Sequence, residues 1–186
     1  ILIKLKRGYL SVKTKKPVLI ILGEPNSVFT EILSKTLNKI TKNKRIFYPI
    51  ILIGSKKLTL SQLRILNLKL DFLEIKKKDI FEKKLKNKIY FLDVNYKFKM
   101  AFEKISKKSK SYIDKCFQEG LSILNRGLSD IVVNGPVSKK HFLDNKYPGI
   151  TEYIFNKSKK KLSKRPVMLI FNQKFSVSPI TTHIPI

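Results

Sequence analysis

The sequence predicts an α/β fold with a mainly parallel sheet and flanking helices. Short apolar runs of strand length alternate along the chain with longer segments whose apolar residues recur at helical spacing. Turn-forming residues follow several of these runs, as in the segments Gly23-Glu24-Pro25 and Asn134-Gly135-Pro136. The 186 residues are 42% hydrophobic, which is enough for a core and suits one domain or one and a half.

Seven apolar runs are expected to form strands. They comprise residues 18–22, 49–53, 72–75, 89–94, 130–133, 167–171 and 176–181. The runs at 18–22, 50–53, 131–133 and 167–171 lack polar alternation, so we expect them to be buried on both faces of the sheet.

Five segments are expected to be helical. They are residues 29–40, a helix starting near Thr59, and residues 100–125, 139–143 and 151–156. Thr59 and Gln62 have the spacing of a capping box, and Ser138 and Thr151 are candidate N-caps. Gly127 follows the longest helix as a C-terminal signal.

The pattern suggests an N-terminal extension at 1–16, a first α/β portion at 17–129 and the start of a second α/β domain at 130–186. Residues 76–88 are charged and loosely patterned, so they are predicted to form a surface insertion. The stretch 157–165 is predicted to be a polar loop.

The net charge of +27 raises the possibility of nucleic-acid binding. However, 35 of the 40 basic residues are Lys and 5 are Arg, whereas base readout favours the bidentate Arg. The lysines are also dispersed, so nucleic acid is not the expected main partner. A basic, non-enzymatic α/β protein that binds nucleic acid remains an alternative, and a steep salt dependence of binding would support it.

Cellular location is constrained by two observations. No apolar run is long enough to cross a membrane, so no membrane partner is expected. Cys116 is the single cysteine, which excludes an intramolecular disulfide and fits a reducing cytoplasm. It lies on the apolar side of a predicted helix, where we expect a buried thiol.

Local motifs for nucleotide or metal binding are missing. The chain has no G-x-G-x-x-G, no Walker A segment and only two histidines, His141 and His183. Ligands of parallel sheets bind beyond the carboxyl ends of the strands. This rule indicates the loops at 23–27, 54–57, 134–139 and 181–185. Within them, Asn134 and Lys139 could contact substrate or phosphate, or equally be a turn residue and a solvated lysine.

Three segments near the C-terminus show a family resemblance. Residues 131–139 read IVVNGPVSK, residues 148–153 read PGITEY and residues 181–185 read TTHIP. Their order and spacing resemble the 4-hydroxythreonine-4-phosphate dehydrogenase family, which has Gly-Pro-Ile-x-Lys, then Gly-His-Thr-Glu, then Thr-Thr-His-x-Pro. The resemblance runs from about Pro17 to the last residue.

This resemblance implies a fold related to the isocitrate and isopropylmalate dehydrogenases, and a homodimer with its active site at the interface. The implied reaction uses NAD, or NADP, to oxidise 4-phosphooxy-threonine, a small phosphorylated substrate. Decarboxylation then gives a phosphorylated amino ketone for vitamin B6 biosynthesis. The family holds a divalent metal ion (zinc, magnesium, manganese or cobalt) through three histidines.

The motif register assigns candidate roles to individual residues. His183 falls on the first metal ligand and Thr151 on a substrate-binding threonine. Ile150 stands where the family has His and is expected to line the substrate pocket. Because Ile150 cannot form a hydrogen bond, a sister dehydrogenase acting on another phosphorylated hydroxy acid is an alternative. His141 matches no ligand position and is interpreted as a surface residue. The resemblance also implies that the second domain is incomplete at its C-terminus. The remaining metal ligands are expected beyond Ile186, so this chain alone is expected to be inactive.

Overall fold

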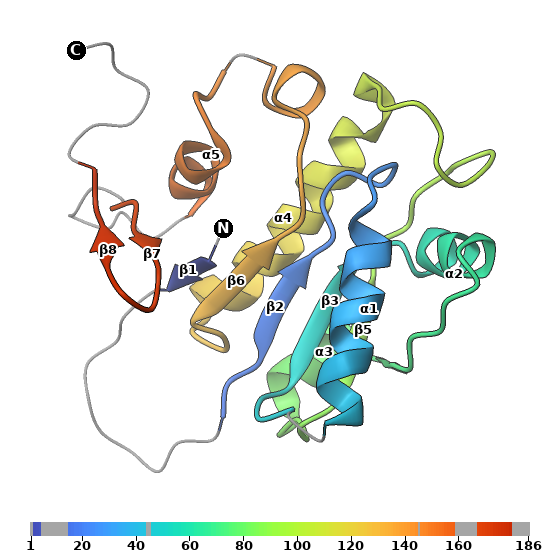
Figure 1. Cartoon of the computed structure of the whole chain (residues 1–186), viewed down its shortest axis with the longest axis horizontal. Coiled ribbons are helices and arrows are strands. Elements are labelled where there is room, and N and C mark those ends of the chain that lie inside the picture. Colours follow the sequence, from blue (N-terminus) through green and yellow to red (C-terminus); the bar gives the residue numbers. More distant parts are fainter. Residues whose placement is uncertain (1, 5–14, 44–45, 145, 159–166, 180–186) are drawn as a thin grey trace.

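The computed structural model describes residues 15–43, 46–144, 146–158 and 167–179, and the backbone of residues 2–4. A six-stranded sheet has helices on both faces, and a two-stranded hairpin forms a second, separate sheet (Figure 1). The order of strands across the sheet is β1-β6-β2-β3-β5-β4. Their bounds are β1 Leu2–Lys4, β2 Val18–Ile21, β3 Ile50–Gly54, β4 Leu73–Glu74, β5 Ile89–Asp93 and β6 Ile131–Asn134.

The pairing confirms the predicted parallel α/β fold. Strand β2 pairs in parallel with β3 on one side and β6 on the other, and β5 pairs in parallel with β3 and β4. Only β1, which the sequence analysis does not predict as a strand, adds to this sheet antiparallel, beside β6. Strand β6 follows the predicted domain boundary at residue 129, so the sheet continues across that point in the chain. The division into domains stays a prediction.

Successive residues of the central strands face opposite layers of helix. Leu19 and Ile51 belong to the apolar cluster that contains α4 (Lys110–Asn125). Ile20 and Leu52 belong to the cluster that contains α1 (Phe29–Lys42) and α2 (Lys56–Ile65). Burial on both faces explains why these strands are uninterrupted apolar runs.

The start of α2 corrects the sequence analysis. The helix begins at Lys56, and the Oγ atom of its N-cap Ser55 accepts a hydrogen bond from the Leu58 amide at 3.3 Å. Thr59 and Gln62 lie buried inside the helix, so the predicted capping box is wrong. Gln62 instead donates through Nε2 to the carbonyl of Pro25 at 2.6 Å, which holds the loop after β2.

The long helix is also shorter than predicted. It begins at Lys110 rather than near residue 100, after a single 3-10 turn η1 (Lys107–Ser109). The carboxylate of Glu103 accepts hydrogen bonds from the amides of Lys99 and Met100, both at 2.9 Å. Phe102 has a left-handed φ of 61°. A local turn therefore replaces the first ten predicted helical residues, although their apolar spacing is helical.

Two shorter helical segments cover the same face as α4. Helix α5 (Ile150–Lys157) starts after Gly149, so the prediction that Thr151 is its N-cap is wrong. The turn η2 (Lys139–Leu143) agrees with its prediction, because the Ser138 hydroxyl accepts from the His141 amide at 3.2 Å.

Residues 76–88 are more than a surface insertion. They contain helix α3 (Lys77–Glu82), whose Ile80 is 4% exposed and packs in the cluster around α4. That buried contact corrects the prediction. Cys116 of α4 is fully buried, as predicted, and burial raises the pKa of its thiol to about 12. Among the described residues, none of the helices combines the length and the apolar character needed to span a membrane.

The hairpin contradicts the prediction of a buried strand at 167–171. It consists of β7 (Ile170–Phe171) and β8 (Ser176–Val177), which pair antiparallel. Val167 is 77% exposed and Phe171 is 73% exposed. Residues 180 and 181 of the last predicted strand lie outside the described residues, as does most of the predicted polar loop at 157–165.

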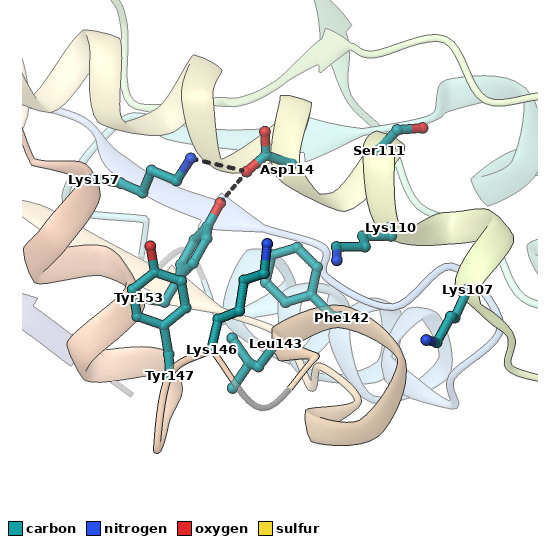
Figure 2. Close-up of a pocket in the computed structure, with 10 residues that line it drawn as sticks. All are labelled: Lys107, Lys110, Ser111, Asp114, Phe142, Leu143, Lys146, Tyr147, Tyr153 and Lys157. Carbon is teal, nitrogen blue, oxygen red and sulfur yellow. Dashed lines mark hydrogen bonds and ion pairs between the residues drawn. The ribbon is translucent and has the colours of Figure 1, made fainter.

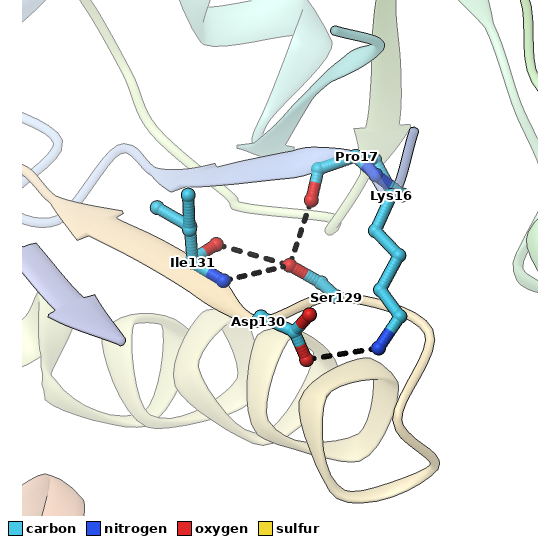
Figure 3. Close-up of polar contacts among 5 residues, drawn as sticks. All are labelled: Lys16, Pro17, Ser129, Asp130 and Ile131. Atoms are coloured by element: carbon cyan, nitrogen blue, oxygen red, sulfur yellow. Dashed lines mark hydrogen bonds and ion pairs between the residues drawn. The ribbon is translucent and has the colours of Figure 1, made fainter. Parts of the chain in front are cut away.

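The amino ends of β2 and β6 are fixed to each other by one buried hydroxyl (Figure 3). Ser129 Oγ donates to the carbonyl of Pro17 at 2.7 Å and accepts from the amide of Ile131 at 3.2 Å, and the Ile131 carbonyl at 3.0 Å is a second possible acceptor. Lys16 pairs with Asp130 at 2.9 Å beside it. These contacts align β2 and β6 at their amino ends. The candidate site lies at the opposite, carboxyl edge of the sheet.

Candidate functional site at the carboxyl edge of the sheet

The loops after β2 and β6 interlock at the carboxyl edge of the sheet. The amide of Glu24 donates to the carbonyl of Pro136 at 2.8 Å, and the amide of Gly135 donates to the carbonyl of Ile21 at 2.7 Å. Two of the predicted ligand-binding loops, 23–27 and 134–139, therefore form one continuous rim. This arrangement agrees with the rule that ligands of parallel sheets bind beyond the strand ends.

Two glycines make this close approach possible. Gly23 has a φ of 73°, and a Cβ atom there would lie 2.4 Å from the carbonyl oxygen of Pro136. A Cβ atom on Gly135 would lie 2.3 Å from the carbonyl oxygen of Leu22. Since real Cβ contacts are never so short, the rim requires a residue without a side chain at both positions.

The rim contains a buried carboxylate that the sequence analysis gave no role. Glu24 is 3% exposed, and its side chain accepts hydrogen bonds from Ser109 Oγ at 3.1 Å and from the Asn26 amide at 3.4 Å. Burial raises the pKa of Glu24, while these hydrogen bonds and the nearby His141 oppose the rise. Glu24 thus connects the β2 loop with the start of α4.

Three buried polar atoms around this edge have no hydrogen-bond partner among the described residues. They are Asn26 Oδ1, Asn134 Oδ1 and His141 Nδ1. His141 is half-buried, which corrects its interpretation as a surface residue. Because buried polar groups are normally paired, the rim offers hydrogen-bonding capacity to a ligand or to water. In the sequence, these residues are marked only by their position in or beside the loops predicted to bind ligands.

The loops after β3 and β5 are fixed by contacts to main-chain amides. The amide of Ser55 donates to the hydroxyl of Tyr112 at 2.8 Å, and the amide of Lys56 donates to Asp93 Oδ1 at 2.8 Å. Tyr112 is 4% exposed, and its burial raises its pKa well above the usual value. This half of the edge is therefore internally bonded, whereas the half near Glu24 has unpaired atoms.

The predicted site residues lie at different depths. Asn134 ends β6, is half-buried and donates through Nδ2 to the carbonyl of Gly135 at 2.9 Å. Lys139 is exposed on η2, and Thr151 is half-buried in the first turn of α5. Ile150 is 7% exposed and packs in the core cluster around α4. Its predicted role in a substrate pocket, like the roles of the other three, stays a prediction.

The predicted metal ligand His183 lies outside the described residues. Within the described ranges, no group of three or more His, Cys, Asp or Glu side chains could hold a metal ion. The metal site therefore also stays a prediction.

A hollow of about 580 Å³ lies between the start of α4, η2 and α5 (Figure 2). We call it the lysine pocket. Its walls carry four lysines, Lys107, Lys110, Lys146 and Lys157, and three aromatic residues, Phe142, Tyr147 and Tyr153. Nothing in the sequence indicates this pocket, because its residues come from segments that only the fold brings together.

Comparison with known proteins identifies the family of the chain. The family described as pyridoxal phosphate biosynthetic protein PdxA matches residues 46–186, which is most of the sequence. The chain belongs to this family. Its sequence is 30% identical over 173 residues to the 4-hydroxythreonine-4-phosphate dehydrogenase of Sulfurihydrogenibium sp. (strain YO3AOP1). That alignment covers 90% of this chain and 49% of the relative.

Solved structures of the same family show the same fold. The 4-hydroxythreonine-4-phosphate dehydrogenase of Burkholderia phymatum superposes with a TM-score of 0.70 at 18% identity, covering 92% of this chain and 51% of that one. The enzyme of Klebsiella pneumoniae gives 0.68 at 18% identity, covering 92% and 52%. The PdxA resemblance inferred from the three motifs is thereby confirmed, and this chain spans about half the length of its relatives.

Proposed function

We propose that this chain forms part of a 4-hydroxythreonine-4-phosphate dehydrogenase of vitamin B6 biosynthesis. The proposed enzyme uses NAD, or NADP, to oxidise 4-phosphooxy-threonine. Decarboxylation of the oxidised product then gives a phosphorylated amino ketone. The observation that carries the proposal is the family match, which includes all three motifs at 131–139, 148–153 and 181–185. A cytoplasmic homodimer with its active site at the interface completes the proposal.

The residues at the carboxyl edge suit a small phosphorylated substrate. Lys139 presents an exposed ammonium group that can pair with phosphate or carboxylate oxygens. The half-buried hydroxyl of Thr151 can donate to or accept from a substrate hydroxyl. Asn134 and Asn26 each have an unpaired amide oxygen that can accept from the substrate ammonium group. These groups would bind and orient the substrate beside the Glu24 carboxyl.

A divalent metal ion is part of the proposal through His183. A neutral imidazole is a suitable ligand for such ions, but catalytic sites usually take about three ligands from protein. Since the described ranges contain no cluster of candidate ligands, the other ligands would come from outside them. When bound, the ion would polarise the substrate oxygen that becomes the carbonyl.

The test uses protein expressed from its complete reading frame. We expect NADH formation with 4-phosphooxy-threonine and NAD, and loss of both bound metal and activity in His183→Ala. Thr151→Val should raise KM, since it keeps the shape of the side chain and removes its hydroxyl. Lys39→Ala on α1, away from the edge, serves as the control. A folded protein that forms no NADH from this substrate contradicts the proposal.

A second candidate function is favoured by Ile150. This apolar residue occupies the position of the family His, so the substrate can differ in the group that the His would contact. Kinetics of Ile150→His on several phosphorylated hydroxy acids would separate the two functions. Gain or loss of one hydrogen bond is worth about 0.5–1.5 kcal/mol in kcat/KM. If kcat/KM is unchanged for every substrate, Ile150 lies outside the pocket, in agreement with its burial in the core.

A further inference from the structure

The lysine pocket lies on a different side of α5 from the proposed substrate residue. Tyr153 and Lys157 line the pocket and are four residues apart, so they share one face of the helix. Thr151 precedes Tyr153 by two residues, which places it on nearly the opposite face at about 100° per residue. A ligand in the pocket would therefore not contact Thr151.

Positive charge exceeds negative charge in the pocket. Lys107 and Lys110 both pair with the single carboxylate of Asp144, each at 3.1 Å. The two lysines hold the pKa of Asp144 below its usual value, so it stays ionised at neutral pH. One carboxylate cannot neutralise two ammonium groups, and an anion at this wall would be attracted.

The rest of the pocket also has an excess of one positive charge, because it contains Lys146 and Lys157 but one carboxylate, Asp114. Lys157 is 3.8 Å from Asp114, whose oxygens already accept from the hydroxyl of Tyr153 and the amide of Gln118, both at 2.5 Å. Lys146 is exposed, and no carboxylate among the described residues pairs with it. Figure 2 shows Lys107 and Lys110 approaching from the α4 side and Lys146 from the loop after η2.

Aromatic rings form the base of the pocket. Tyr153 packs edge-to-face against Phe142 at 5.0 Å and against Tyr147 at 5.4 Å between ring centroids. Phe142 and Tyr153 are 4% exposed, whereas Tyr147 is half-buried. Tyr147 can therefore present part of its ring to a ligand. The volume of about 580 Å³ lies within the usual range for small-molecule sites.

We propose that the lysine pocket binds a small phosphorylated molecule that carries a planar ring, such as a nucleoside monophosphate. The ammonium groups of Lys110 and Lys146 bind the phosphate, because lysine acts as a compact positive charge for phosphate oxygens. The ring of Tyr147 packs against the planar ring of the ligand. The proposal is argued from the charges and rings of the pocket itself, and no residue proposed to bind substrate lines it.

The test is calorimetric titration of protein expressed from its complete reading frame with AMP, ribose 5-phosphate, adenosine and pyrophosphate. We expect AMP to bind more tightly than ribose 5-phosphate or adenosine, because only AMP supplies both the phosphate and the ring. Lys146→Ala should weaken AMP binding about tenfold, the scale of one charge-assisted contact, and Lys146→Arg should restore most of it. Tyr147→Leu should weaken the binding of AMP but not that of pyrophosphate.

The matched control is Lys39→Ala. Lys39 lies in a second surface hollow on α1 with Lys35 and Lys42, which has no aromatic wall. This variant should bind AMP as tightly as the wild type, with an unchanged melting temperature in both lysine variants. Equal weakening by Lys39→Ala and Lys146→Ala would overturn the proposal in favour of general attraction of anions to a basic surface. Equal affinity for AMP and ribose 5-phosphate would also overturn it, because the ring would then contribute nothing.

Discussion

Strands β3 and β7 are both apolar in sequence, yet β3 is buried and β7 is exposed. Ile51 and Ile53 of β3 are 0% exposed, whereas Ile170 and Phe171 of β7 are 60% and 73% exposed. Strand β3 has a parallel neighbour on each side and a helical layer on each face, while among the described strands β7 pairs only with β8. An apolar run thus favours an extended strand, but its burial depends on the elements that reach both of its sides.

The largest expected effect separates these two regions. Ile51→Ala removes methyl groups from a fully packed position and should lower the free energy of unfolding by about 2–5 kcal/mol. The matched change Ile170→Ala in the hairpin should cost less than about 0.5 kcal/mol, because the side chain is already in water. Urea denaturation of both variants measures the difference. Similar losses would show that the hairpin is packed in solution and would remove the contrast.

A smaller loss of stability is expected at Gly23, in the loop that follows β2. Gly23→Ala places a Cβ atom against the Pro136 carbonyl and forces a left-handed φ on alanine. We expect a loss of about 1–3 kcal/mol. Gly127→Ala is the control. Gly127 has the same φ of 73° but follows the C-terminal end of α4, whereas the loop of Gly23 lies near the start of that helix. If both variants lose equal stability in thermal denaturation, the contact between the loops adds nothing to the cost of placing alanine at a left-handed φ.

The smallest effect on stability is expected at the buried carboxyl of Glu24. Burial raises the pKa of Glu24 above its unfolded value, so its contribution to stability is complete below the unfolded pKa and is lost as pH rises through the folded pKa. Glu24→Gln should therefore stabilise the protein at pH 7 by about 1 kcal/mol, and the gain should vanish near pH 4. Unfolding free energies measured across this range test the sign. Glu31→Gln, which breaks only an exposed pair with Lys35, should give no such gain.

The sequence predicts the central sheet well because its signal is local and redundant. Each of β2, β3 and β6 combines β-branched residues with turn-forming residues that follow the strand, and burial on both faces favours such a composition. The helix starts were predicted less well. Ser55 and Thr59 are equally plausible caps from their residue types, and only the fold places Ser55 at the helix end and Thr59 in the core.

The site could be predicted only as a set of loops. Strand-end rules selected 23–27 and 134–139, and these loops do meet in the structure. The contact between Glu24 and Ser109 joins residues 85 positions apart, and no spacing rule encodes it. The lysine pocket was missed for the same reason, since its charged residues look like ordinary solvated lysines in the sequence.

Cys116 is a natural probe for the opening of the core. It is the only thiol in the chain, it is fully buried in α4, and its pKa of about 12 keeps the reactive thiolate scarce at neutral pH. A thiol reagent can therefore label it only when α4 lifts from the sheet. The rate of labelling in the absence of denaturant would report how often the core opens, without any engineered probe.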